Sequence, residues 1–206
     1  MRVDRPGPGE ELSDGAVAEA RPAASVILLR DTAAGPEVLL LRRNPHARFM
    51  GGAWVFPGGA VDPSDGGPLD AGIRETEEEA GVALGDPGEL AAFSRWITPA
   101  RVTIRYDTWF FVTRAPAQAR VLVDGSEVVD FRWIRPRDAL DLGARDELSL
   151  VFPTVKHLEQ LARFESVDAA IADARSRRVL PVEPRVLVDG GVARVLMPGE
   201  PGYDDA

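Results

Sequence analysis

The stretch "RETEEEAG", residues 74–81, places four glutamates within five consecutive positions. Its surroundings predict a helix that ends at Gly81, because glycine is the usual residue just after a helix C-terminus. Like charges one turn apart, such as Glu75 and Glu79, destabilise a helix by roughly a few tenths of a kcal/mol, and acids near the C-terminus meet the negative end of the helix dipole. This conflict with helix physics marks a candidate functional site, although a solvated charged face is the alternative interpretation.

The helical phase of these glutamates favours a metal site. At about 100° per residue, the side chains of Glu75, Glu78 and Glu79 fall within an arc of about 100°, whereas Glu77 points nearly the other way. Three carboxylates in one arc are hard oxygen ligands suited to Mg²⁺ or Mn²⁺, and a bound dication would remove their repulsion. The residues that we expect to be buried form a separate stripe, Leu69, Ile73, Thr76 and Ala80.

The segment before this helix, "FPGGAVDPSDGG" (56–67), reads as an irregular glycine-rich loop. Glycine allows the backbone to take positive φ and to approach a ligand closely, although such a loop alone is more often a plain turn. Joined to the glutamate helix, it resembles the Nudix box, whose pattern is a glycine, a spaced acid and then R-E-apolar-x-E-E-x-G-apolar. The residues that occupy the last part of this pattern in register are Arg74, Glu75, Thr76, Glu78, Glu79, Gly81 and Val82.

Two residues depart from the pattern of the box. Thr76 stands where the family usually has an aliphatic residue, a change that a buried stripe tolerates. The spaced acid is Asp65 in place of glutamate, and residues 66–73 separate it from Arg74, one more than the strict pattern allows. The sequence therefore leaves the role of Asp65 open, while the three helix glutamates are unaffected.

The resemblance implies both a fold and a chemistry. It implies an α/β fold, the Nudix-type α/β/α sandwich with a mixed sheet. It also implies a hydrolase dependent on Mg²⁺ or Mn²⁺ that cleaves a nucleoside diphosphate linked to another group. In that case Glu75, Glu78 and Glu79 hold the metal, and Arg74 orients the carboxylates. Gly58 and Gly59 shape the loop.

The composition of the chain limits its other partners. A chain of 206 residues with 45% hydrophobic and 28% charged residues is a normal globular sequence, long enough for one domain. Its net charge of −9 argues against general binding to nucleic acid or to anionic membrane. It has no cysteine, which excludes disulfides, thiolate ligands and a thiol nucleophile. We expect a cytoplasmic protein that binds a small nucleotide or coenzyme substrate.

The order of patterns along the chain predicts one domain after an arm. Residues 1–21 carry Pro, Gly and acids without periodicity, so we expect a flexible arm, followed by a single domain over 22–206. Strands are expected at 23–31, 37–43, 89–98, 104–114 and 127–134. Helices are expected at 136–142, 150–164 (interrupted at Pro153) and 167–178, followed by a hairpin at 185–197 that turns at 189–191.

The sequence does not identify the general base. Nudix enzymes resembling this one take it from the box helix or from a separate loop or strand. Glu127 is the distal candidate, because it begins a strand after a glycine turn; a solvent-facing strand residue is the alternative. His46 and His157 have no partner at ligand or triad spacing, so we interpret both as surface or capping residues. The four tryptophans lie in strand-like segments and are expected mostly in the core.

Arginines before the box favour one substrate. The segment "LLLRRNPHARFMGGAWVFPGG" (39–59) resembles a signature of coenzyme A diphosphatases, which Leu41 and Asn44 break at two places. Two fixed guanidiniums suit bidentate phosphate recognition, and coenzyme A carries a diphosphate and a 3′-phosphate. The alternative is that Arg43 ends a strand in solvent and Arg48 is a loop charge. The residues that match the signature in register are Leu39, Leu40, Arg43, Arg48, Gly52, Phe56, Pro57, Gly58 and Gly59.

The later segments "WITPARVTIRYDTWFFV" and "VLPVEPRV" resemble the same coenzyme A branch. Two interpretations of Arg105 and Tyr106 stay open: contact with the substrate, or a place at the edge of a sheet. Coenzyme A or an acyl-coenzyme A is therefore the expected substrate. ADP-ribose, a dinucleotide or an oxidised nucleotide is the alternative. A non-catalytic nucleotide sensor is the alternative of another class, although a sensor would be expected to lose part of the carboxylate set. The oligomeric state is not determined by the sequence, and a homodimer stays open.

Overall fold

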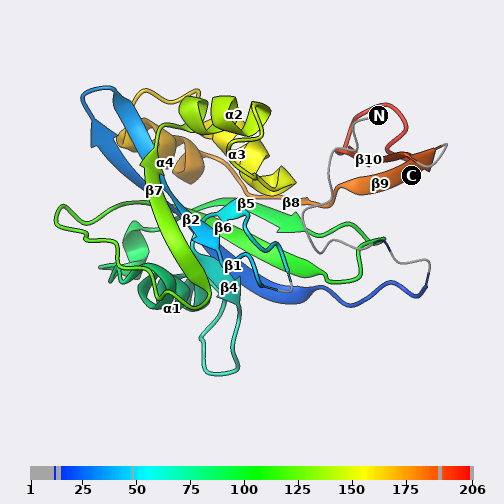
Figure 1. Cartoon of the computed structure of the whole chain (residues 1–206), viewed down its shortest axis with the longest axis horizontal. Coiled ribbons are helices and arrows are strands. Elements are labelled where there is room, and N and C mark those ends of the chain that lie inside the picture. Colours follow the sequence, from blue (N-terminus) through cyan, green and yellow to red (C-terminus); the bar gives the residue numbers. More distant parts are fainter. Residues whose placement is uncertain (1–11, 13–14, 48, 190–191, 205–206) are drawn as a thin grey trace.

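The computed structural model describes residues 12, 15–47, 49–189 and 192–204 (Figure 1). The helices are α1 (Pro68–Ala80), α2 (Pro136–Ala144), α3 (Phe152–Leu161), α4 (Val167–Ser176) and the short 3₁₀ helix η1 (Pro87–Glu89). The strands are β1 (Arg21–Thr32), β2 (Gly35–Arg43), β3 (Trp54–Val55), β4 (Gly58–Ala60), β5 (Ala91–Ile97), β6 (Tyr106–Arg114), β7 (Val128–Ile134), β8 (Pro181–Val182), β9 (Arg185–Asp189) and β10 (Val192–Leu196).

Strands of both orientations form the central sheet. Among the described residues, eight strands join it; the main path runs β3-β2-β1-β6-β5-β8, with β4 paired to β1 and β7 paired to β2. The β1–β6 and β5–β8 pairs are parallel, and the other pairs of the sheet are antiparallel. β9 and β10 form a separate antiparallel hairpin. The predicted mixed sheet is confirmed.

Helices cover both faces of this sheet. Successive side chains of a strand point to opposite faces, so a strand buried on both sides is apolar without alternation. In β1, Ile27 packs into the cluster that includes α2, α3 and α4, whereas its neighbour Leu28 packs into the cluster that includes Ala80 of α1. Figure 1 shows α1 on one side of the sheet and α2, α3 and α4 on the other. The predicted α/β/α sandwich is therefore confirmed.

Helix α1 ends where the sequence predicts, but its buried face differs from the predicted stripe. Gly81 takes the left-handed conformation with φ 65°, and its N–H bonds to the carbonyl of Glu77. Leu69 and Ile73 are only partly buried. The reason is close packing: a Cβ on Gly72 would lie 3.1 Å from Val26 of β1, so the small side of the helix faces the sheet. The buried residues of α1 are Ala71, Gly72, Thr76, Glu79 and Ala80.

Three further sequence expectations change in detail. Pro153 lies in the first turn of α3 and does not interrupt a longer helix, because the first turn needs no N–H donor. Part of the expected loop, Gly58–Ala60, forms β4 beside β1. The hairpin strands are present, while the turn residues 190–191 lie outside the described residues, as does most of the segment 1–21; the domain boundaries stay a prediction. No helix in the described part of the chain is long and apolar enough to cross a membrane.

Candidate active site

The last turn of α1 carries a buried carboxylate, Glu79. One of its oxygens accepts a hydrogen bond of 2.9 Å from the N–H of Gly58, and the other lies 4.0 Å from a guanidinium nitrogen of Arg43. Burial raises the pKa of Glu79 to about 7, against the opposing effects of Gly58 and Arg43, and the charges of Glu75 and Glu127 raise it further. A bound cation would stabilise the charged form of a carboxylate buried in this way.

The two glycines of the loop bring the backbone against this helix. A Cβ on Gly58 would collide with the carbonyl oxygen of Ala24 and with Ser25, and φ of Gly58 is 155°, a value that other residues rarely adopt. A Cβ on Gly59 would collide with the carboxylate of Glu75. Only glycine at these positions lets the loop donate to Glu79 while Glu75 stays in place.

Arg74 connects the carboxylates of the helix to the loop. Its Nη1 donates to Glu75 (2.8 Å) and to Glu78 (2.9 Å). Its Nε and Nη2 donate to the two oxygens of Asp65, at 3.1 and 3.0 Å, and Nη2 also donates to the carbonyl of Ala60 at 3.1 Å. The position of Asp65, which the sequence left open, is thereby explained: it holds Arg74 in a bidentate pair.

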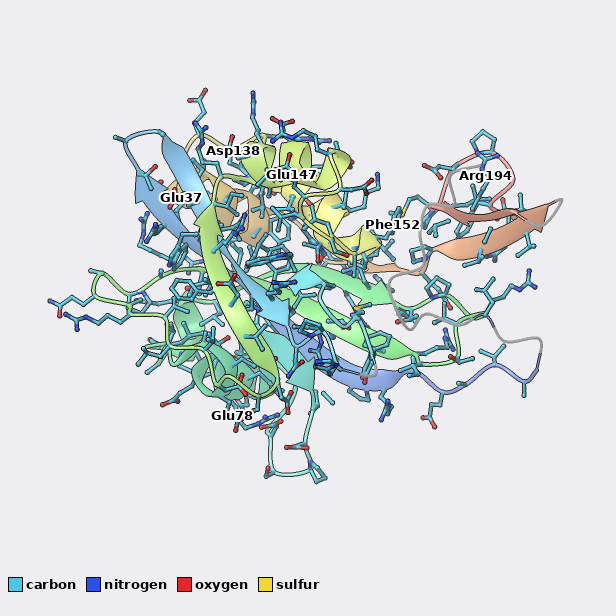
Figure 2. The ribbon with its side chains drawn as sticks, in the orientation of Figure 1. Glu37, Glu78, Asp138, Glu147, Phe152 and Arg194 are labelled. Atoms are coloured by element: carbon cyan, nitrogen blue, oxygen red, sulfur yellow. The ribbon has the colours of Figure 1, made fainter. Side chains whose placement is uncertain are left out.

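The three box glutamates differ strongly in exposure. The side chains of Glu79, Glu75 and Glu78 are 5%, 16% and 58% exposed. Burial raises the pKa of Glu75, while the hydrogen bond from Arg74 opposes the shift and the charges of Glu78 and Glu127 add to it. In Figure 2, Glu78 lies on the α1 side of the molecule. The three carboxylates of the predicted arc therefore range from buried, at Glu79, to exposed, at Glu78.

A cavity of about 390 Å³ opens beside these groups. It is lined by the two loop glycines, by Arg43 at the end of β2 and by Glu127 just before β7. Glu127 is exposed, and its backbone carbonyl accepts a hydrogen bond of 2.8 Å from the N–H of Asn44, which fixes the start of β7 against the end of β2. The sequence-predicted residues that line this cavity together are Arg43, Gly58, Gly59, Glu75, Tyr106 and Glu127.

Two predicted substrate-binding residues, Arg105 and Tyr106, make hydrogen bonds within the protein. Arg105 is 9% exposed and donates to the carbonyls of Thr98 and Ala18 and to the carboxylate of Glu183. These bonds tie separate segments together, so the structure gives Arg105 contacts within the protein. The hydroxyl of Tyr106, which lines the cavity, accepts a hydrogen bond of 3.2 Å from Arg21. Arg48 lies outside the described residues.

The expectation that His157 is a surface or capping residue is wrong. It is 1% exposed, and its two ring nitrogens lie 2.6 Å from Ser94 Oγ and 2.6 Å from the carbonyl oxygen of Pro153. The centroid of its ring lies 4.2 Å from the ring centroid of Phe110. Burial lowers the pKa of His157 to about 3, so the imidazole is neutral in the folded protein. It is a core residue, as are Trp54 and Trp96.

Sequence reasoning missed the apolar part of the cavity. Its wall comes from segments far apart along the chain, and no spacing within any one of them indicates that they meet. The hairpin near the C-terminus of the chain was expected, but nothing in the sequence of the hairpin indicates that it lies close to the box. The apolar lining from outside the box region includes Phe49, Trp96, Ile97, Val102, Phe110, Phe152, Val186, Ala193 and Val195.

The carboxylates fit the metal that the box implies, although their present arrangement does not enclose one. In the described part of the chain, no group of three His, Asp or Glu side chains is set to hold an ion. Glu75 and Glu78 are both engaged by Arg74. Burial, with a smaller contribution from acidic neighbours, raises the pKa of Glu75 and of Glu79, so a bound cation would stabilise the charged form of each. A hard dication with oxygen ligands meets that chemistry.

Comparison with known proteins identifies the family of the chain. The NUDIX domain model matches residues 19–154. A Caenorhabditis elegans protein named as nudix hydrolase 7 is 25% identical over 90% of this chain and 75% of its own length.

Solved structures share the fold. The crystal structure of a NUDIX hydrolase from Alicyclobacillus acidocaldarius is 25% identical, with a TM-score of 0.69, and covers 76% of this chain and 97% of that one. The NUDIX domain of Shewanella oneidensis NrtR, complexed with ADP ribose, is 20% identical, with a TM-score of 0.56, and covers 69% of this chain and 86% of that one.

Proposed function

Because the chain belongs to the Nudix family and is a Nudix hydrolase, we propose that it hydrolyses the diphosphate of a nucleoside diphosphate linked to another group, with Mg²⁺ or Mn²⁺ as cofactor. The observation that carries this proposal is the meeting of Glu75, Arg43 and the Gly58–Gly59 loop at one cavity, beside the buried Glu79. Hydrolysis of an anionic diphosphate needs both a metal cation and fixed hydrogen-bond donors. The carboxylates would bind the cation, and Arg43 and the loop would supply the donors.

The residues that would hold the metal are Glu75, Glu78 and Glu79. When bound, the ion would neutralise diphosphate charge and lower the pKa of an attacking water. The chain's own residues keep the ligands in position: the N–H of Gly58 holds Glu79, and Arg74 holds Glu75 and Glu78. Asp65 in turn fixes Arg74. Such outer contacts orient ligands and commonly contribute about 10- to 100-fold to metal affinity or activity.

Glu127 is the proposed general base. It lines the same cavity as Glu75, and its charge contributes to the raised pKa of both Glu75 and Glu79. An exposed carboxylate at the cavity can take the proton of the attacking water and release it to solvent. The box glutamates, Glu78 and Glu79, are the alternative source of this function.

Coenzyme A or an acyl-coenzyme A is the proposed substrate, giving 3′,5′-ADP and a 4′-phosphopantetheine product. Support comes from Arg43, which lines the cavity beside the loop glycines. A guanidinium at that place is suited to binding a phosphate. Arg48 is proposed as the second phosphate ligand on the sequence signature alone.

A panel of substrates tests this assignment. Rates with coenzyme A, dephospho-coenzyme A, ADP-ribose, NADH and 8-oxo-dGTP are compared in Mg²⁺ and then in Mn²⁺. We expect coenzyme A to be hydrolysed fastest and both Arg43→Ala and Arg48→Ala to reduce its kcat/KM. Faster hydrolysis of ADP-ribose or NADH would support the alternative substrates, ADP-ribose or a dinucleotide. ADP ribose is the ligand bound in the structure of the NrtR NUDIX domain. Tight binding without turnover of any of the five would favour a nucleotide sensor.

A further inference from the structure

The cavity has a wall that lies outside the part of the chain matched by the NUDIX model. That match ends at residue 154, whereas Val186 of β9 and Ala193 and Val195 of β10 line the same cavity as Arg43 and Glu75. The hairpin lies well away from α1 in Figure 1. In Figure 2, Glu78 marks the α1 side, while the cavity residue Phe152 lies toward the hairpin. The cavity therefore runs from the box to the hairpin.

Among the described residues, the hairpin side chains that line the cavity offer a ligand no hydrogen bonds. Its residues in the cavity are valine and alanine, and Pro184, just before β9, adds another apolar surface. A sugar or amide placed there would give up its hydrogen bonds to water without replacing them, which is unfavourable. An alkyl group would instead gain from leaving water. The wall thus selects an apolar ligand group.

Hydrogen bonds at the base of the hairpin connect it to the segment before β6 and to the C-terminal segment. Arg105, just before β6, donates to the carboxylate of Glu183 at 2.7 Å. The hydroxyl of Tyr203 donates to the carbonyl of Glu183, also at 2.7 Å, and Arg185 donates to the carbonyl of Tyr203 at 2.9 Å. Val186 and Leu196 are 6% and 4% exposed. The bond from Arg105 links the hairpin base to the rest of the domain, and the bonds of Tyr203 and Arg185 link it to the C-terminal segment.

We propose that the β9–β10 hairpin forms a binding subsite for the acyl chain of an acyl-coenzyme A, with Val186, Ala193 and Val195 as specificity-determining residues. The inference rests on the proposed function for the diphosphate end of the ligand. With the diphosphate at Arg43 and Glu75, the rest of the substrate extends along the cavity. Of the parts of an acyl-coenzyme A, only the acyl chain lacks hydrogen-bonding groups, so it is the part that suits the hairpin.

Equilibrium binding tests the subsite apart from catalysis. Dissociation constants of coenzyme A and of butanoyl-, hexanoyl- and octanoyl-coenzyme A are measured by calorimetry on the full chain with EDTA, where hydrolysis is suppressed. Each buried methylene should tighten binding by up to about threefold to fourfold, and we expect octanoyl-coenzyme A to bind at least tenfold more tightly than coenzyme A. Val195→Asp should abolish this dependence on chain length and leave the affinity for coenzyme A within about twofold.

Val188→Asp is the matched control, because Val188 lies on the same hairpin, is 40% exposed and does not line the cavity. It should behave as the wild type. Equal affinities for coenzyme A and octanoyl-coenzyme A, equal weakening of both by Val195→Asp, or no binding of octanoyl-coenzyme A would each overturn the inference. Parallel assays with Mg²⁺ decide the proposed function separately: tighter acyl binding without hydrolysis would retain the subsite and reject the diphosphatase activity.

Discussion

Helix α1 and the β9–β10 hairpin build the two sides of one cavity by different means. The helix side depends on charged groups a few residues apart: Glu75 lines the cavity, Glu79 is buried in the same helix, and their spacing alone puts them one turn apart. The hairpin side depends on small apolar residues, such as Val186 and Val195, that meet the cavity only through tertiary packing. The comparison teaches that the chemistry of this site is encoded locally, whereas the shape available to the substrate is not.

The largest expected effect is on the helix side. Glu79→Gln should abolish turnover, because it removes a carboxylate proposed to hold the metal. The fold should stay intact, since glutamine matches the size of a side chain whose buried charge is already disfavoured. Turnover and thermal unfolding are measured together. Glu77→Gln, at an exposed position of the same helix, is the control and should be fully active. Undiminished activity of Glu79→Gln would remove Glu79 from the metal site.

A second prediction concerns Glu127, on the strand β7 side of the cavity. If it is the general base, Glu127→Gln should lower kcat by about 10²-fold or more and change the shape of the pH-rate profile. Asp130→Asn, an exposed acid on β7, should leave both unchanged. A profile of Glu127→Gln with unaltered shape and height would transfer the role of base to the box helix.

A smaller effect is expected from the contact that orients the box. Asp65→Asn removes one charged partner of Arg74, so kcat should fall by about tenfold or somewhat more, as for other groups that orient ligands. Asp62→Asn is the matched control, because Asp62 is 61% exposed and its carboxylate lies 3.7 Å from Arg74. Arg74 then keeps its bidentate pair with Asp65. Equal rates for both variants would show that Asp65 does not position Arg74.

The smallest effect lies in the core behind the cavity and concerns stability. The pKa of His157 falls from about 6.5 in the unfolded chain to about 3 in the folded protein. Between pH 6.5 and 3, His157 therefore binds a proton in the unfolded state and stays neutral in the folded state. The contribution of neutral His157 is complete above pH 6.5 and is lost as the pH falls toward 3, by up to about 1.4 kcal/mol per pH unit.

His157→Gln should show a shallower loss of unfolding free energy between pH 6.5 and 4.5 than the wild type, measured by urea denaturation at several pH values. His46→Gln, at an exposed position, should follow the wild type. Identical slopes for the wild type and His157→Gln would contradict the assigned neutral, buried state.

Most of the fold could be predicted because its signals are local. Runs such as those around Ile27 and Leu39 are apolar without alternation, which suits strands covered on both faces, and each becomes a central strand. Details were missed where packing overrides local pattern. Gly72 lets α1 lie close to β1, which turned Leu69 and Ile73 partly outward. His157 carries no sequence signal of burial, because its environment of Phe56, Phe93, Trp96 and Phe110 is assembled from the strands β5 and β6 and the segment before β4.

By itself, the sequence determined the family and predicted the carboxylate set of the site, because helical periodicity fixes the relative directions of Glu75, Glu78 and Glu79 wherever the helix lies. Only the tertiary structure decided how these groups differ: Glu79 is buried under the Gly58 loop, Glu78 is exposed, and Asp65 holds Arg74. It also decided that the hairpin reaches the cavity. The physical reason is that burial, and with it pKa and apolar contact, depends on which distant segments pack together, a property that residue spacing does not contain.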